Sequence, residues 1–124
     1  MCANTWCAVM CVIVCCAGCH ALGVNLDDPA VEVTNESQCR VEHLVAVVMY
    51  DGVEERATLS DLPMGGRSRM TRRTSDMIVQ SIQYEQAGEQ YRSDVLLNIT
   101  PGEVLVVVIS DGGRVETSQQ CAKG

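Results

Sequence analysis

Short β-branched apolar segments, each followed by turn residues, limit what this chain can fold into more than any other feature. Residues 43–50 and 103–110 are the most apolar of these segments, and both have the length of a buried strand. Asp51-Gly52 follows the first and Asp111-Gly112-Gly113 follows the second, and Asp-Gly is a strong hairpin signal. We therefore expect residues 44–49 and 104–109 to form central strands.

The remainder of the segment 31–124 repeats the same pattern. Strand-like stretches recur at intervals of about 8–12 residues with turn residues between them, and no convincing helix of about ten residues appears. This pattern predicts an all-β fold, an antiparallel β-sandwich of about seven or eight strands. The other expected strands are residues 31–34, 53–59, 67–73, 76–85, 90–99 and a short edge at 115–118.

The N-terminal part of the chain has a different composition. Residues 6–18 are uncharged and apolar, which matches a signal-peptide h-region and is too short to cross a bilayer as a helix. The residues before this stretch contain no Lys or Arg, unlike most signal peptides. We expect a helical signal peptide at 1–18, a tether at 19–30 and one β-sandwich domain at 31–124.

The end of the leader resembles the lipobox of bacterial lipoproteins. Cys16, Ala17, Gly18 and Cys19 carry the resemblance, although Cys16 stands where Leu is usual. The resemblance implies that Cys19 is lipidated and becomes the first residue of the mature protein. A lipid anchor would then make the membrane a partner. Ordinary secretion and an uncleaved start are the alternatives.

The same residues allow a second interpretation. Cys16, Cys19 and His20 form a C-x-x-C-H motif, the pattern for covalent attachment of c-type haem with the histidine as an iron ligand. Because the first nineteen residues contain cysteines at positions 2, 7, 11, 15, 16 and 19, such a motif arises easily by chance. We therefore expect no cofactor and no metal, with an electron-transfer protein carrying haem c as the alternative.

Cys39 and Cys121 are the two cysteines in the expected domain. Outside the cytosol such a pair is plausible as a disulfide. A bridge between them would tie the last segment of the domain to its beginning and would constrain the unfolded chain. Two free thiols are the alternative.

The net charge of −7 excludes nucleic acid as a partner on electrostatic grounds, since an acidic domain repels phosphate backbones. Arg67, Arg69 and Arg73 are the local exception, because alternation places them on one face of a strand and Arg72 on the other. They predict either a charged edge strand protected from pairing with other chains or a patch for an acidic partner.

The sequence contains no recognisable catalytic set, so we expect a protein that is not an enzyme. No nucleophile stands in a strand-to-helix elbow, and His43 opens an apolar strand, where a structural role is expected. The aromatic content is 3%, and sugar-binding surfaces usually depend on aromatic faces. Carbohydrate is therefore a weak candidate as a ligand.

Three segments of the domain resemble a group of small, largely uncharacterised bacterial exported proteins with a transthyretin-like or immunoglobulin-like sandwich. They are V-E-V-T-N-E-S at 31–37, L-P-M-G-G-R-S-R-M at 62–70 and I-T-P-G-E-V-L-V-V-V-I at 99–109. The resemblance implies a fold and a location in the cell envelope, and it implies no activity.

The sequence thus leads to one functional hypothesis. We expect a non-enzymatic lipoprotein of the periplasm, outer membrane or cell surface, or else a secreted protein, that serves as an accessory or interaction module for an unknown protein partner.

Overall fold

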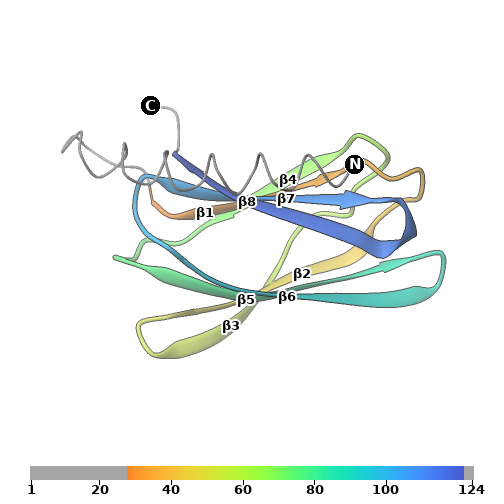
Figure 1. Ribbon diagram of the computed structural model, residues 1–124. Helices are drawn as coiled ribbons and strands as arrows, with labels where there is room; N and C mark the ends of the chain where they lie inside the picture. Colours follow the sequence, from red (N-terminus) through yellow and green to blue (C-terminus); the bar gives the residue numbers. More distant parts are fainter. Residues whose placement is uncertain (1–27, 122–124) are drawn as a thin grey trace.

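The computed structural model describes residues 28–121, which form two four-stranded sheets packed face to face (Figure 1). The protein is an all-β sandwich, as the sequence pattern predicts. The eight strands of the described part are β1 (Ala30–Asn35), β2 (Glu42–Tyr50), β3 (Val53–Thr58), β4 (Arg67–Thr71), β5 (Met77–Gln86), β6 (Glu89–Ile99), β7 (Glu103–Ser110) and β8 (Arg114–Cys121), with a short 3-10 turn, η1 (Asp111–Gly113), before β8.

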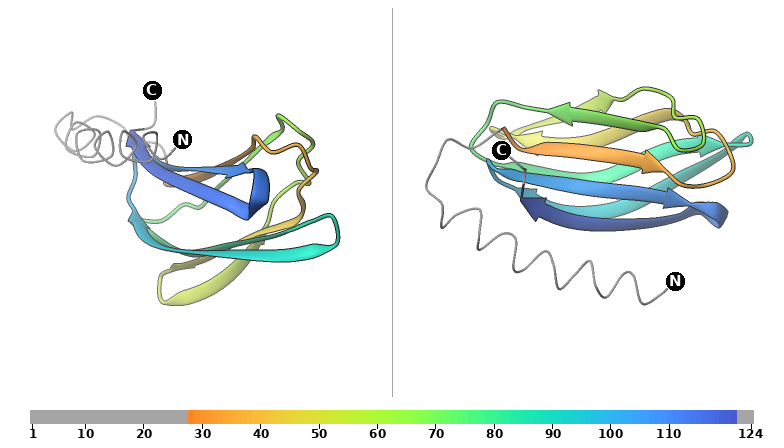
Figure 2. Two further views of the ribbon diagram at one scale, coloured as in Figure 1. Left: turned by 45° about the vertical axis from the view of Figure 1, so that its right-hand side comes forward. Right: turned by 90° about the horizontal axis from the view of Figure 1, so that it is seen from above.

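The strand order is β4-β1-β7-β8 in one sheet and β3-β2-β5-β6 in the other. Figure 2 shows the first sheet from above, lying over the second. The two most apolar strands, β2 and β7, each lie between two neighbours, which confirms the prediction that they are central. A central strand has a neighbouring strand on each edge, so its side chains are more shielded from water than those of an edge strand.

One strand pair differs from the antiparallel expectation. β1 runs parallel to β7, and Ala30 lies opposite Val104 while Asn35 lies opposite Ile109. Parallel neighbours cannot be joined by a tight turn and need a long crossover between them. Here the crossover is the chain from β2 to β6, which builds the opposite sheet and one edge strand before returning.

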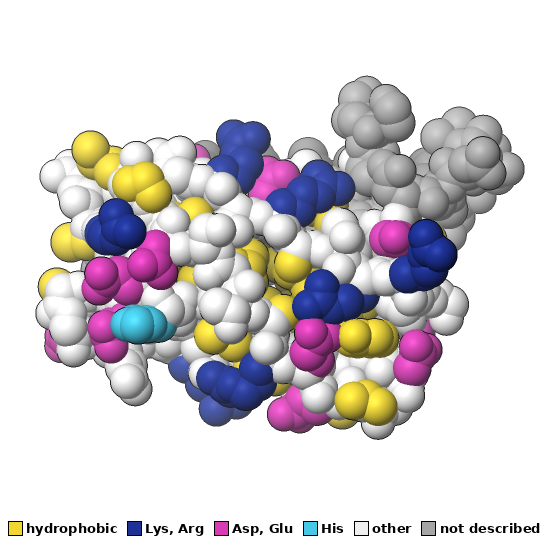
Figure 3. All heavy atoms as spheres, turned by 180° about the vertical axis from the view of Figure 1, so that it is seen from behind, with side chains coloured by type: hydrophobic (Ala, Val, Ile, Leu, Met, Phe, Trp, Pro, Cys, Tyr) yellow, Lys and Arg dark blue, Asp and Glu magenta, His cyan; other side chains and the backbone are white. Residues whose placement is uncertain are grey.

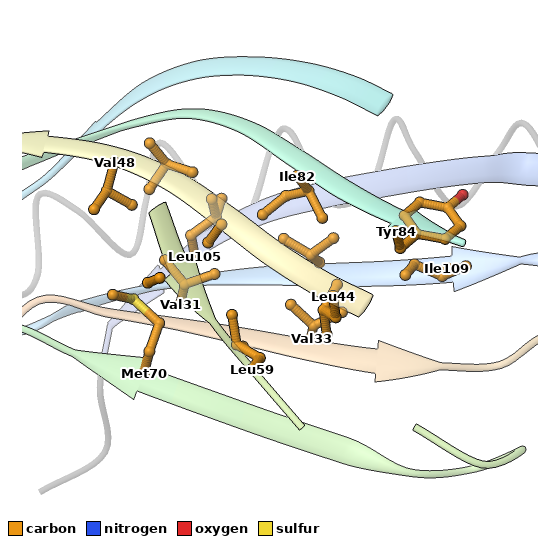
Figure 4. Packing of buried hydrophobic residues seen from close by; sticks show 14 of the residues in the cluster. Val31, Val33, Leu44, Val48, Leu59, Met70, Ile82, Tyr84, Leu105 and Ile109 are labelled. Carbon is orange, nitrogen blue, oxygen red and sulfur yellow. The ribbon is translucent and has the colours of Figure 1, made fainter. Parts of the chain in front are cut away.

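The core lies between the sheets and is almost entirely aliphatic. Alternate residues of each strand point inward, as the period of two along a strand requires; Val31 and Val33 of β1 and Leu105, Val107 and Ile109 of β7 are fully buried. Side chains from both sheets meet across the middle (Figure 4). The facing residues of the second sheet include Leu44, Ala46, Val48, Val79, Ile82 and Tyr84.

The three segments that carry the family resemblance are hydrogen-bonded to one another at one end of the sandwich. The side-chain amide of Asn35 donates to the carbonyl of Leu62, and the backbone N–H of Asn35 donates to the carbonyl of Gly66. The N–H of Glu36 donates to the carbonyl of Ile109. These bonds hold the loop between β3 and β4 against the ends of β1 and β7.

Candidate functional site: a groove on the outer face of the second sheet

A groove of about 680 Å³ crosses the outer face of the sheet β3-β2-β5-β6. Each of the four strands contributes at least one side chain, because outward-pointing residues of neighbouring strands stand opposite one another. Val45 lies opposite Gln83, which in turn lies opposite Arg92. We call this surface the outer-face groove, and its principal residues are His43, Val45, Arg56, Gln83, Glu85 and Arg92.

Arg56 is the most distinctive residue of the outer-face groove. It projects from β3, opposite Val47 of β2, and its Nη2 donates a hydrogen bond of 3.0 Å to the Oε1 of Gln83 on β5. Gln83 is neutral, and no carboxylate of the described residues forms an ion pair with Arg56. The guanidinium is therefore held in place across β2 while keeping its charge and its remaining N–H donors available.

The groove carries two further cationic or basic side chains. Arg92 pairs with Asp94 on its own strand at 3.0 Å, and both side chains are well exposed, so this pair contributes little binding energy of its own. The Nε2 of His43 lies 3.8 Å from a carboxylate oxygen of Glu85. The groove is thus richer in basic than in acidic groups, although the whole chain carries a net charge of −7.

His43 does not have the structural role expected from its place in an apolar strand. The register between β2 and β5 shifts between Glu42 and Val45, and His43 adopts a left-handed conformation with φ of 51°. A bulge of this kind redirects a side chain, and here it leaves the imidazole 77% exposed at the groove. The sequence contains no signal for the bulge, because histidine tolerates this conformation without a neighbouring glycine.

An apolar row borders the groove on the same face. Met49 lies opposite Ile78, and Ile78 lies opposite Asn98 of β6. Ile78 is 38% exposed, and Leu96, two residues before Asn98, is 72% exposed. Together with the half-buried Val45 of β2, these side chains form what we call the apolar row: Val45, Met49, Ile78 and Leu96. Val47, between Val45 and Met49 on the same strand, is only 5% exposed.

Arg67 and Arg69 lie on β4, which is an edge strand of its sheet, and Arg73 follows it; that they bind an acidic partner stays a prediction. Arg67 and Arg69 do share the outer face of β4, but both pair with Glu32 of β1, at 3.6 Å and 3.7 Å. Arg73 lies beyond the end of β4 and is exposed. Figure 3 shows the edge formed by β3 and β4, where basic and acidic side chains lie beside one another.

Arg72 joins the two sheets at this same edge. Its Nε and Nη2 donate to the two carboxylate oxygens of Glu55 on β3, at 2.8 Å and 2.6 Å, and the hydroxyl of Tyr50 donates to Glu55 at 2.8 Å. Hydrogen bonds from Arg72 and then from Tyr50 lower the pKa of the Glu55 carboxyl to about 2. The hydrogen bond to Glu55 raises the pKa of Tyr50. We call Tyr50, Glu55 and Arg72 the edge clamp.

The expected disulfide between Cys39 and Cys121 is wrong, because the thiol of Cys39 is free and exposed. The parallel pairing of β1 with β7 explains this result. Cys39 follows β1 near Ile109, at one end of β7, whereas Cys121 lies opposite Glu103, at the other end. Six residues of strand separate the two ends by roughly 20 Å, and a disulfide requires Cα atoms within about 7 Å.

Several expectations concern residues that lie outside the described part of the chain. They are the signal peptide at 1–18, most of the tether at 19–30, the lipidation site Cys19 and the haem motif of Cys16, Cys19 and His20. Within residues 28–121, no cluster of three or more His, Cys, Asp or Glu side chains is arranged to hold a metal ion. The same residues include no helix with the length and apolarity needed to span a membrane.

The fold and the groove together define a small β-sandwich with a polar, partly basic surface site. No protein-family model and no curated protein matches the sequence. Among solved structures, the chain is similar to the NMR structure of a protein from Eubacterium rectale, with a TM-score of 0.50 and 12% identity over 79% of this chain and 91% of the other. At this identity the likeness shows the fold alone.

A second structure is similar at a lower score. It is the crystal structure of a "putative cell adhesion protein" from Bacteroides ovatus, with a TM-score of 0.46 and 8% identity. The match covers 81% of this chain and 47% of that protein.

Proposed function

We propose that this protein is a non-enzymatic interaction module of the cell envelope that binds an anionic partner in the outer-face groove. One observation carries the proposal: Arg56 is held by Gln83 with its charge uncompensated, at a groove that Arg92 and His43 also line. A guanidinium that is fixed in place and still has free N–H donors binds carboxylates well, because little side-chain entropy remains to be lost.

The chemistry of the groove favours binding over catalysis. Its lining residues include no Ser, Thr or Cys that could serve as a nucleophile, and the His43–Glu85 contact of 3.8 Å is exposed to solvent on the histidine side. Basic and amide side chains on a rigid sheet are well suited to recognise an anion. The all-β sandwich supports this interpretation by providing that rigid frame.

The location in the envelope is part of the proposal and depends on residues 1–19. Lipidation at Cys19 would keep the module at a membrane surface, with the resemblance to exported transthyretin-like or immunoglobulin-like sandwiches in agreement. Metabolic labelling with a palmitate analogue should mark the wild-type protein and not Cys19→Ser. Label that persists after this substitution would contradict the anchor without affecting the groove.

Binding of fluorescein-labelled poly-L-glutamate, followed by fluorescence anisotropy at low salt, tests the groove. Arg56→Gln should weaken binding about tenfold, because a charge-assisted hydrogen bond is lost. Arg73→Gln is the matched control, since Arg73 is an exposed arginine away from the groove, and it should leave the affinity within about twofold. Equal losses in both variants, or a loss in Arg73→Gln alone, would show that the groove is not the binding site.

A further inference from the structure

We infer that the partner of this face is an acidic polypeptide segment that carries aliphatic side chains, bound in an extended conformation across the outer-face groove and the apolar row together. The inference rests on the proposed function and adds the class of the partner. Three observations support it: Leu96 is exposed, a bulge in β6 presents it, and the apolar row is continuous with the outer-face groove.

Leu96 occupies a conformation that a leucine rarely adopts. Val79 pairs with Leu97 and Ser81 pairs with Asp94, so that two residues of β6 stand opposite Gln80 of β5. Leu96 is the second of these two and has φ of 54°. The left-handed region costs an L-residue with a Cβ roughly 1–2 kcal/mol, whereas glycine adopts it readily.

Burial in the core does not offset this strain. The Leu96 side chain is 72% exposed and is not part of the core cluster. A strained backbone position that places a large apolar side chain in solvent is a feature found at interaction sites. We therefore infer that the bulge presents Leu96 to a binding partner.

The apolar row and the outer-face groove form one surface. Leu96 and Arg92 lie on the same strand, four residues apart, or roughly 13 Å along β6. Arg92 is already paired with Asp94, which lies between it and Leu96, so Arg56 is the arginine that would receive a ligand carboxylate. Alternate side chains of an extended ligand are about 7 Å apart, so a ligand of a few residues crossing the strands can place an apolar side chain at Leu96 and a carboxylate at Arg56. Arg56 and His43 extend the basic side of the surface across β3 and β2.

The composition of the surface favours a polypeptide over an acidic polysaccharide. Sugar rings stack on exposed aromatic faces. Tyr84 and Tyr91 are among the residues that line the groove, but their ring faces are stacked on each other. Tyr84 is 3% exposed and its ring stacks on Tyr91 with centroids 5.3 Å apart, while the Tyr50 hydroxyl binds Glu55 at the opposite edge of the sheet. Aliphatic side chains beside arginines match a peptide that alternates apolar and acidic residues.

Two labelled synthetic peptides test the inference with the full-length protein. Both are short and rich in glutamate; one has leucines at regular intervals and the other has serines at the same positions. The wild type should bind the leucine peptide about tenfold more tightly than the serine peptide, the gain expected from burying a leucine side chain. Leu96→Gly should remove this preference and leave the serine peptide within about twofold.

Leu96→Gly should also change thermal stability and binding in opposite directions, which would not happen if Leu96 only stabilised the fold. Because glycine relieves the strain at the bulge, Leu96→Gly should raise the melting temperature by about 4 °C while it weakens binding of the leucine peptide. Met64→Ser is the matched control, because Met64 is 68% exposed and lies in the loop between β3 and β4. It should leave the leucine preference unchanged.

The outcomes separate this inference from the proposed function. Equal affinity of the wild type for the two peptides, or a preference that survives Leu96→Gly, overturns the inference even if polyglutamate binding still requires Arg56. Polygalacturonate that displaces the leucine peptide at equal concentration of carboxylate also overturns it, in favour of a polysaccharide. A leucine preference that disappears with Leu96→Gly while Arg56→Gln has no effect supports the apolar contact and overturns the proposed function.

Discussion

Asn35 shows at the scale of single residues how one amide organises a loop cluster. It is fully buried, and its Nδ2 donates to three carbonyl oxygens, those of Cys39, Leu62 and Pro63. Its Oδ1 accepts from the backbone N–H and the hydroxyl of Ser37. An amide is required here because the site needs donors on one side and an acceptor on the other.

Asn35→Asp should therefore destabilise the domain by about 3 kcal/mol, because a carboxylate would face three carbonyl oxygens in a buried site. Urea denaturation at neutral pH measures the effect. Asn98→Asp is the control: Asn98 is exposed at the end of β6, so its free energy of unfolding should stay within about 0.5 kcal/mol of wild type. Similar losses in the two variants would show that the Asn35 amide is not required.

At the scale of elements, two hairpins have the same type of two-residue turn but different residues at its first position. The β2–β3 turn is Asp51-Gly52 with φ of 53° and 75°, and the β5–β6 turn is Ala87-Gly88 with φ of 51° and 79°. Two consecutive positive φ values characterise the type I′ turn, which suits the twist of antiparallel strands. Asp tolerates the first position well, whereas alanine is strained there.

Ala87→Asn should raise the free energy of unfolding by about 0.5–1 kcal/mol, because asparagine adopts this conformation more readily than alanine. Ala87 is exposed, so the new side chain meets no steric barrier. Thermal unfolding of Asp51→Asn provides the comparison and should show little change, since Asp51 already suits its turn. An unchanged or lower melting temperature for Ala87→Asn would contradict the strain at this turn.

The strands could be predicted from the sequence because they follow from local properties. The bulges could not. Residues 103–110 were expected as a strand and form β7 with the same bounds, because their apolar length and flanking turns are local properties. His43 and Leu96 lie in strands that were also expected, yet the register shifts that expose them leave no mark in the sequence. A bulge depends on how two strands distant in sequence pair.

At the scale of the whole molecule, the edge clamp connects the two layers of the sandwich. Arg72 follows β4, an edge strand of one sheet, and Glu55 belongs to β3, an edge strand of the other. Their side chains are 30% and 33% exposed. A bidentate, partly buried pair is stronger than a typical surface ion pair. The clamp therefore contributes to holding the β3–β4 edge closed.

The stability of the protein should fall in acid partly because of this clamp. The pKa of Glu55 is lowered from 4.5 to about 2 in the folded state, so its contribution is complete above about pH 5 and is lost as the pH falls toward 2. Glu55→Gln should be less stable than wild type by about 1 kcal/mol at neutral pH, and the difference should vanish near pH 2.

Chemical denaturation across this pH range, with Arg72→Gln as the control, checks the prediction. Because Arg72 supplies the largest part of the pKa shift, Glu55→Gln should cost much less in an Arg72→Gln background. A constant difference between wild type and Glu55→Gln from neutral pH to acid would show that the clamp does not act through the charge of Glu55.

The amino-acid sequence by itself determined the all-β class, the strand positions and the two central strands, because apolar alternation and turn chemistry act over a few residues. Only the tertiary structure decided the parallel pairing of β1 with β7, which separates Cys39 from Cys121, and the pairing of Arg67 and Arg69 with Glu32. It also decided which residues meet in the outer-face groove. These features depend on which distant strands become neighbours and in what register. The choice of neighbours and register is set by packing of the whole core and not by any local segment.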